Sequence, residues 1–116
     1  MRRMLIVEDE QDLCDCLQTY FSSRGFSVTS AFSGEEAVEQ LNTAPADVIL
    51  LDILLPGISG LEVLRYAKKR YPGARIVMVT AQDRLELRAE ARLYGACAYI
   101  TKPFDFSETT WSPVFA

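Results

Sequence analysis

The chain alternates five short apolar or β-prone runs with stretches of helical spacing, and this alternation restricts the possible folds more than any other feature. The expected strands are 4–8, 26–30, 47–52, 75–80 and 97–101. The expected helices are 11–24, 33–42, 59–70 and 83–94. Repeated strand–helix units form parallel sheets with helices on both faces, joined by right-handed crossovers. The sequence therefore predicts a doubly wound α/β fold, whereas periodicity alone leaves the order of the strands open.

Local signals mark where the expected helices start and stop. Ser33, Ser59 and Asp83 are each followed three residues later by a glutamate, which is the spacing of an N-terminal capping box. Gly25 and Gly95 stand where two helices should end, as glycine commonly does. These signals predict the helix boundaries given above.

The C-terminal segment 105–116 departs from the regular pattern. A final helix is expected after the last strand to cover one edge of the sheet, but the segment is rich in Ser and Thr and contains Pro113. We therefore predict at most a short or irregular helix there. With 116 residues, no linker and no repeat, the chain is expected to form one domain over 1–116, atypical only in this last segment.

Polar side chains of related chemistry stand at or just after the ends of the expected strands. Glu8 and Asp9 follow the first strand, Asp52 ends the third, Thr80 ends the fourth, and Lys102 follows the fifth. Because ligands of open parallel sheets bind outside the carboxyl ends of the strands, these side chains should meet at one edge. Carboxylates at close range repel by roughly 4 kcal/mol per pair, and a hard dication removes that penalty. The pattern predicts a Mg²⁺ site suited to phosphoryl transfer.

The composition argues against several other classes of function. A net charge of −4 and a pI of about 4.8 argue against direct nucleic-acid binding, which needs a basic surface. No apolar run approaches the roughly 18 residues of a membrane span, so no membrane association is expected. Cys14, Cys16 and Cys97 lack the spacing of a metal site or disulfide framework, which indicates reduced thiols and a cytoplasmic location.

The chain contains no histidine. This absence excludes His-based nucleophilic triads and His-ligated zinc. It also means that the chain cannot serve as its own phosphohistidine donor. If phosphoryl transfer occurs, the phosphoryl group has to come from another molecule.

Four motifs, in this order and on these expected elements, resemble the receiver domain of two-component response regulators. They are LIVEDE at 5–10, LDILLPG at 51–57 followed by Gly60, VTA at 79–81, and YITKPF at 99–104. The resemblance covers roughly 4–106. It implies a flavodoxin-like (βα)5 fold, a five-stranded parallel sheet of order 2-1-3-4-5, and phosphorylation at Asp52.

The resemblance also implies a role for each acidic residue of the pattern. Asp52 is the nucleophile that forms an acyl phosphate. Asp9 and Asp52 bind Mg²⁺ directly, Glu8 acts through water, and the backbone carbonyl of Leu54 is a further metal ligand. The simpler interpretations are that Asp52 is a turn residue and that Glu8 and Asp9 favour the start of the helix at 11–24. For Glu8 and Asp9 both roles can hold together.

The same resemblance assigns residues to the phosphoryl group and to a switch. Lys102 pairs with the phosphoryl oxygens, the Thr80 hydroxyl bonds to the group, and the Ala81 N–H assists. Tyr99 is the rotamer switch, moving inward when Thr80 moves toward the phosphate. Taken singly, Lys102 is an ordinary surface lysine, and Thr80 and Tyr99 are ordinary strand residues. The bond between Lys102 and Pro103 is commonly cis in this family.

The implied function is a phosphorelay switch in two-component signal transduction. A sensor histidine kinase or phosphotransfer protein donates the phosphoryl group, and the altered face controls an output domain or a protein partner. The oligomeric state stays open, a homodimer included. The chain is expected to assist its own phosphorylation and dephosphorylation without being an enzyme in the usual sense.

Two other functions compete with this interpretation. The first is a Mg²⁺-dependent phosphatase with an Asp nucleophile, although haloacid-dehalogenase-like sites want a second Asp two residues later, where this chain has Leu54. The second is an interaction module of the same fold that works without phosphorylation.

Leu54 and Gln82 match family positions that tune phosphate lifetime. Because an apolar Leu54 cannot orient an attacking water, slow self-dephosphorylation is expected.

Overall fold

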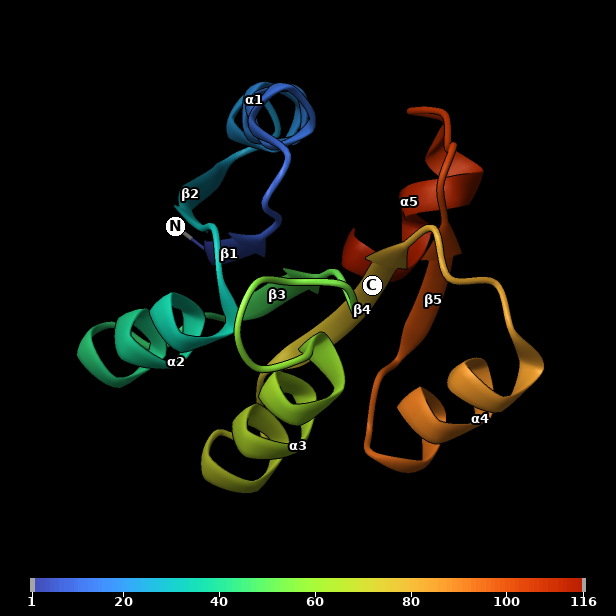
Figure 1. Ribbon diagram of the computed structural model, residues 1–116. Coiled ribbons are helices and arrows are strands. Elements are labelled where there is room, and N and C mark those ends of the chain that lie inside the picture. Colours follow the sequence, from blue (N-terminus) through green and yellow to red (C-terminus); the bar gives the residue numbers. More distant parts are fainter. Residues whose placement is uncertain (1, 116) are drawn as a thin grey trace.

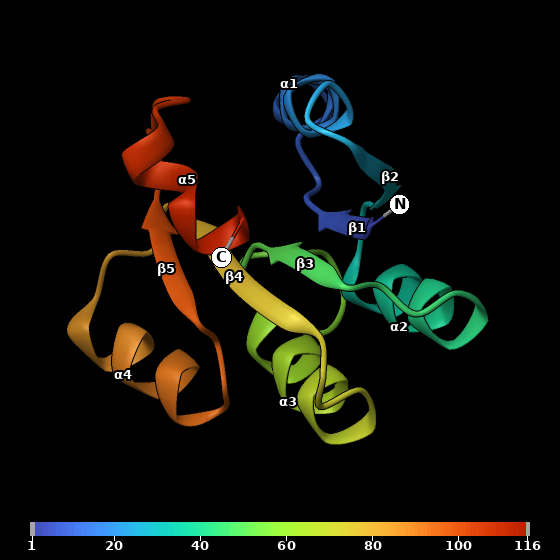
Figure 2. The same ribbon diagram turned by 180° about the vertical axis from the view of Figure 1, so that it is seen from behind.

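The computed structural model describes residues 2–115, which form one parallel sheet with helices on both faces (Figure 1 and Figure 2). The strands are β1 (Arg2–Val7), β2 (Phe26–Ala31), β3 (Val48–Leu51), β4 (Arg75–Thr80) and β5 (Ala98–Thr101). Their order in the sheet is β2-β1-β3-β4-β5, and every neighbouring pair is parallel. The predicted fold class and strand order are thereby confirmed.

Five helices cover the two faces of the sheet. They are α1 (Gln11–Ser22), α2 (Gly34–Thr43), α3 (Gly60–Arg70), α4 (Leu85–Leu93) and α5 (Glu108–Phe115). Helices α1 and α5 lie on one face, and α2, α3 and α4 lie on the other (Figure 1). Within residues 2–115, no helix combines the length and the apolar character that crossing a membrane requires.

The continuous apolar runs are explained by two cores, one on each face of the sheet. Successive side chains of a strand point to opposite faces, so a strand covered on both faces has no polar side. Residues that face α2, α3 and α4 include Leu5, Val7, Ile49 and Leu51, and residues that face α1 and α5 include Met4, Ile6, Val48 and Leu50. Each of these side chains is at most 2% exposed, and full burial of such a side chain contributes roughly 1.5–3 kcal/mol.

Two of the three predicted helix starts have the expected side-chain cap. The Ser33 hydroxyl accepts a hydrogen bond from the Glu36 N–H, and the Ser59 hydroxyl accepts one from the Glu62 N–H. The prediction that Asp83 starts a helix is wrong, because α4 begins at Leu85 after an Arg84 without a side-chain cap. The Asp83 carboxylate instead binds the Arg88 guanidinium, with 2.9 Å between Oδ1 and Nε. Asp83 therefore forms an ion pair with Arg88 and does not cap the helix.

Helix α1 is shorter than predicted. It ends at Ser22 instead of residue 24, because the Arg24 and Gly25 N–H groups bond three residues back, to Phe21 and Ser22. Gly25 then adopts a φ of +93°, a conformation that glycine tolerates at no steric cost. The predicted stop at Gly25 is therefore correct, and the last turn before it is tighter than an α-helix.

The C-terminal segment forms a short helix, as predicted. Helix α5 has eight residues and contains Pro113, which has no N–H to offer to the Thr109 carbonyl. The Ser112 hydroxyl donates to that carbonyl at 3.2 Å instead. The helix is held to the sheet by buried Trp111 and Val114, and the Trp111 indole N–H donates to the Asp105 carbonyl at 2.7 Å.

The start of α5 leads to a prediction about pH. Asp105 accepts hydrogen bonds from the Thr110 hydroxyl (2.7 Å) and from the Ser107 N–H (3.1 Å), and these bonds hold its pKa below the usual 3.8. A depressed carboxyl pKa stabilises the fold above the unfolded-state value, and this contribution is lost as the pH falls through the folded-state value. We expect Asp105→Asn to be less stable than wild type in urea at neutral pH, with the difference shrinking below pH 3.8. A difference that stays constant across this range would contradict the assignment.

Candidate functional site

The register of the strands brings the predicted residues to one edge of the sheet. Val7 pairs with Leu51, so Glu8 and Asp52, each one residue further along, lie side by side. The Asp52 N–H donates to the Val7 carbonyl at 3.1 Å, and the Lys102 N–H donates to the Thr80 carbonyl at 2.9 Å. The backbone of the sheet therefore fixes where these side chains begin.

Three carboxylates converge at this edge. One oxygen each from Glu8, Asp9 and Asp52 lies within 4.8 Å of the others. Glu8 is 2% exposed and Asp52 is 5% exposed, whereas Asp9 is exposed to solvent. A hard oxygen donor set that is open on one side suits Mg²⁺, which takes few carboxylates and keeps several waters.

Lys102 forms ion pairs with both buried carboxylates. Its Nζ lies 2.6 Å from Glu8 Oε1 and 2.9 Å from Asp52 Oδ2. Burial alone lowers the pKa of Lys102, but the hydrogen bonds to Glu8 and Asp52 outweigh it and raise the pKa overall, so the amine stays charged. Burial raises the pKa of Glu8, against the opposing effect of its bond to Lys102. The peptide bond between Lys102 and Pro103 is cis.

Asp52 is also held by the turn that follows it. Its Oδ1 accepts a hydrogen bond from the Leu54 N–H at 3.3 Å, so the side chain is a turn residue as well as part of the acidic cluster. Behind it, the Gly60 N–H donates to the Ile53 carbonyl at 2.8 Å. A Cβ on Gly60 would overlap the Asp52 carbonyl oxygen and lie 2.8 Å from the Ile53 Cα. The start of α3 thus packs directly against the backbone of Asp52.

Thr80 and Tyr99 meet at Gln82. Thr80 is fully buried, and its hydroxyl accepts from the Gln82 N–H at 3.3 Å. Half-buried Tyr99 donates its hydroxyl to the Gln82 carbonyl, and the Arg88 guanidinium lies 4.8 Å from the centre of its ring. Burial raises the pKa of the Tyr99 hydroxyl. Among residues 2–115, no hydrogen bond joins Thr80 or Tyr99 to Asp52, and Ala81 is exposed between Thr80 and Gln82.

Two sets of contacts near the site were not indicated by the sequence: those of the Gln82 backbone and that of the Glu35 carboxylate. By its sequence position Gln82 is expected only to affect phosphate lifetime, yet its backbone links Thr80 to Tyr99. Glu35 has the sequence position of a first-turn helix acid, yet its Oε2 accepts from the Ile58 N–H at 3.1 Å in the loop after Asp52. No spacing rule could have found the second contact, because the two residues are 23 positions apart.

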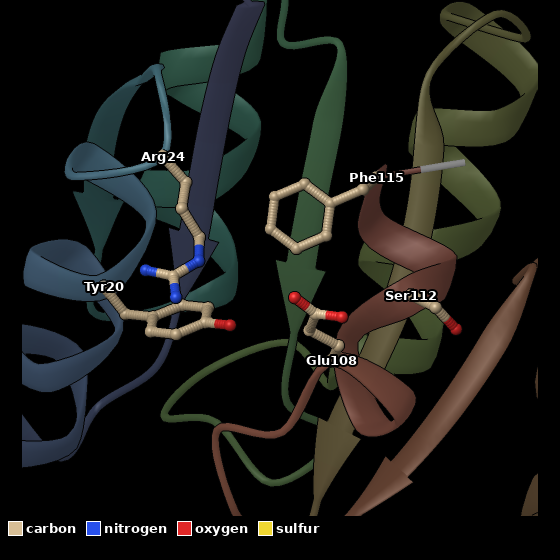
Figure 3. Close-up of a pocket in the computed structure, with 5 residues that line it drawn as sticks. All are labelled: Tyr20, Arg24, Glu108, Ser112 and Phe115. Atoms are coloured by element: carbon tan, nitrogen blue, oxygen red, sulfur yellow. The ribbon is translucent and has the colours of Figure 1, made fainter.

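A separate groove lies away from the strand ends. It is a groove of about 580 Å³ between α1 and α5, lined by Tyr20, Arg24, Glu108, Ser112 and Phe115. In Figure 3, Arg24 stands over the Tyr20 ring on one side, and Phe115 and Glu108 reach toward them from the other. None of the predicted site residues lines this groove. The polar cluster at the strand ends and this groove are therefore separate features.

Comparison with known proteins identifies related sequences. A protein-family model described as the response regulator receiver domain matches residues 4–110. The transcriptional regulatory protein DltR of Streptococcus agalactiae is 37% identical over 106 residues, which are 91% of this chain and 47% of DltR. The uncharacterized transcriptional regulatory protein YkoG of Bacillus subtilis is 37% identical over 105 residues, which are 90% of this chain and 46% of YkoG. The chain spans about half the length of these curated relatives.

Solved structures with the same arrangement of elements are also available for comparison. A CheY-like response regulator receiver domain from Methanospirillum hungatei is 32% identical, with a TM-score of 0.87 over 90% of this chain and 84% of that one. The response regulator TrrA of Thermotoga maritima, solved in complex with Mg²⁺-BeF, is 33% identical. Its TM-score is 0.84, over 97% of this chain and 96% of TrrA.

Proposed function

This chain belongs to the family of response regulator receiver domains, and from that membership we propose that it is a switch controlled by phosphorylation of Asp52. The observation that carries the proposal is the contact set of Lys102, whose amine lies 2.6 Å from Glu8 and 2.9 Å from Asp52. A cation that bridges two buried acids beside a third acid, Asp9, supplies positive charge next to a carboxylate that could accept an anionic group.

The proposed reaction transfers a phosphoryl group from a phosphohistidine of another protein. An Asp52 carboxylate oxygen attacks phosphorus, the new P–O bond forms as the P–N bond to the donor breaks, and the donor imidazole leaves. Asp9, Asp52 and the Leu54 carbonyl would hold Mg²⁺, with Glu8 acting through water, and the ion would supply positive charge against the transferring group. Lys102 and the Thr80 and Ala81 groups bind the phosphoryl oxygens.

Charge explains why both the metal and the lysine are needed. Three carboxylates and Lys102 sum to about −2, and a dication brings the site to about zero. Phosphorylation consumes the Asp52 charge and adds a group of about −2, which leaves the site near −1. If Mg²⁺ or the Lys102 ammonium were missing, the phosphorylated site would carry more negative charge than this. That charge would be costly, because Glu8 and Asp52 are almost fully buried.

We also propose how phosphorylation reaches the surface. In the described conformation the Thr80 hydroxyl is engaged by Gln82, and Tyr99 binds the same residue from the other side. The Thr80 hydroxyl accepts from the Gln82 N–H and is free to donate to a phosphoryl oxygen on Asp52. Movement of the hydroxyl toward the phosphoryl group would lengthen its bond to Gln82 and thereby change the position of Tyr99. The affected face contains α4, β5 and the start of α5. This is a two-state element biased by a local charge.

The partners follow from the same family membership. The donor is proposed to be a sensor histidine kinase or phosphotransfer protein, since the chain has no histidine of its own. The relatives DltR and YkoG are named as transcriptional regulatory proteins and are about twice as long as this chain, which supports an output domain or output protein. Receiver domains are in general not classical enzymes, and we propose that this one assists only its own phosphorylation and dephosphorylation.

The proposal is tested by intact mass spectrometry of the wild-type chain with acetyl phosphate. We expect a gain of one phosphoryl group when Mg²⁺ is present and none when it is removed with EDTA. The absence of any gain at saturating Mg²⁺ and donor would contradict the proposal and favour an interaction module that works without phosphorylation. Release of many phosphates per chain from a phosphate monoester would instead indicate a phosphatase.

The lifetime of the phosphoryl group gives a further prediction. Leu54 is 63% exposed, and its apolar side chain cannot hydrogen-bond a water that attacks phosphorus. We expect Leu54→Asn to dephosphorylate roughly fivefold faster than wild type, the effect of one positioned hydrogen bond worth about 1 kcal/mol. The decay of purified phosphoprotein, followed by mass after removal of the donor, measures this rate. An unchanged rate would remove Leu54 from the control of lifetime.

A further inference from the structure

We infer that Glu35 is a positioning residue for the phosphorylation site, acting through the loop 53–59 that follows Asp52. Glu35 belongs to α2 and is not one of the acids at the strand ends. It reaches across to the loop that carries the Leu54 carbonyl. The inference rests on the proposed function, because it concerns how the metal-binding side of that site is held in place.

The first contact joins the Glu35 carboxylate to the backbone of the loop. Its Oε2 accepts a hydrogen bond from the Ile58 N–H at 3.1 Å. A Cβ added to Gly57 would overlap Glu35 Oε1 and lie 2.5 Å from its Cδ. Gly57 also has a φ of +78°, where side chains other than hydrogen are disfavoured. The carboxylate therefore lies flat against the glycine and bonds the residue after it.

A second contact between α2 and the loop is made by the neighbouring glycine. The Gly34 N–H approaches the Pro56 carbonyl at 3.5 Å, and a Cβ on Gly34 would lie 2.6 Å from the Ile58 carbonyl oxygen. Helix α2 is fixed at this end, because the Ser33 hydroxyl caps it through the Glu36 N–H. The loop thus rests against a rigid helix end, and Glu35 is the side chain that binds it there.

The loop in turn controls the geometry at Asp52. At its start, the Leu54 N–H donates to Asp52 Oδ1 at 3.3 Å. At its end, the Gly60 N–H donates to the Ile53 carbonyl at 2.8 Å. Between these points the Leu54 side chain is 63% exposed, whereas Leu55 and Ile58 are partly buried against the core that α2, α3 and α4 cover. The bond from Glu35 to the Ile58 N–H adds a restraint on the backbone itself, and so helps to set the orientation of the loop that carries the Leu54 carbonyl.

Loss of the Glu35 carboxylate should affect the loop and Mg²⁺ binding but not the overall stability of the fold. Glu35 is exposed, so removing its carboxylate leaves both hydrophobic cores intact and should hardly change the urea midpoint. The loop should become more mobile, which weakens a metal ligand set that includes its backbone. We expect the Mg²⁺ dissociation constant to rise roughly fivefold, the order of effect that one lost hydrogen bond has on an equilibrium.

The test compares Glu35→Ala, Glu35→Gln and the control Glu39→Ala, an exposed acid on the same helix. Mg²⁺ affinity is measured by isothermal titration calorimetry, and loop mobility by amide hydrogen exchange at Leu54 and Ile58. We expect weaker Mg²⁺ binding and faster exchange in Glu35→Ala. Glu35→Gln retains an oxygen acceptor, so its Mg²⁺ affinity and its protection from exchange should be close to those of wild type. Glu39→Ala should match wild type in both measurements.

The outcomes distinguish this inference from the function on which it rests. Wild-type and Glu35→Ala proteins with equal Mg²⁺ affinity and equal exchange would overturn the role of Glu35 while leaving phosphorylation of Asp52 intact. A wild-type protein that neither binds Mg²⁺ nor becomes phosphorylated would overturn both. If Glu35→Ala unfolds, Glu35→Met takes its place, because methionine keeps the length of the side chain but removes the carboxylate acceptor. Weaker Mg²⁺ binding and faster exchange at Ile58 in Glu35→Met support the inference, and wild-type affinity and exchange overturn it.

Discussion

Asp52→Asn is expected to remain unmodified by acetyl phosphate under conditions that phosphorylate the wild-type chain fully. An amide lacks the nucleophilic carboxylate oxygen that forms the acyl phosphate, so the loss should be complete. The substitution is nearly isosteric, and the amide oxygen can still accept from the Leu54 N–H. Lys102 keeps its bond to Glu8. The variant should therefore fold, and intact mass with Mg²⁺ and donor measures the effect directly.

The matched control for this experiment is Asp12→Asn. Asp12 is an exposed acid in the first turn of α1 and lies outside the cluster formed by Glu8, Asp9 and Asp52. It should become phosphorylated like wild type. A phosphoryl group that still appears on Asp52→Asn at the wild-type rate would mean that another side chain is the acceptor.

Gly60→Ala should reduce the free energy of unfolding by about 3 kcal/mol, the upper part of the usual range for overpacking a rigid site. The added methyl would overlap the Asp52 carbonyl oxygen and crowd the Ile53 Cα at 2.8 Å, and both are backbone atoms that cannot rotate away. Relief requires α3 to move from the end of β3. Because that end carries Asp52, the rate of phosphorylation should fall together with stability. Urea unfolding and the mass assay report the two effects separately.

Gly73→Ala provides the control for added volume at a glycine. A Cβ on Gly73 meets no atom within 4 Å, and its φ is not positive. Alanine there should leave phosphorylation unchanged and stabilise the fold by up to about 1 kcal/mol, through the lower entropy of the unfolded chain. Equal stability of Gly60→Ala and Gly73→Ala would show that the close approach of Gly60 to Asp52 carries no constraint.

The predictions that succeeded on the fold concern local physics. Apolar runs such as 48–51 had to be buried on both faces, and Ser33 and Ser59 bond N–H groups only three residues away. Asp83 shows where this reasoning ends. Its spacing fits a cap equally well, but Arg88 competes for the carboxylate, and the ion pair at 2.9 Å is the outcome. A spacing rule considers one possible interaction of a side chain and takes no account of other groups, such as Arg88, that can bind the same carboxylate.

The candidate site shows the same division. The sequence by itself determined which chemical groups end the strands, because a carboxylate, hydroxyl or amine after an apolar run is visible in one dimension. Only the tertiary structure decided which of them meet: Lys102 binds Glu8 and Asp52 across 94 and 50 residues, and Glu35 binds the loop after Asp52 across 23. These pairings depend on strand register and on the docking of helix ends, which arise from packing between segments that the chain brings together only when it folds.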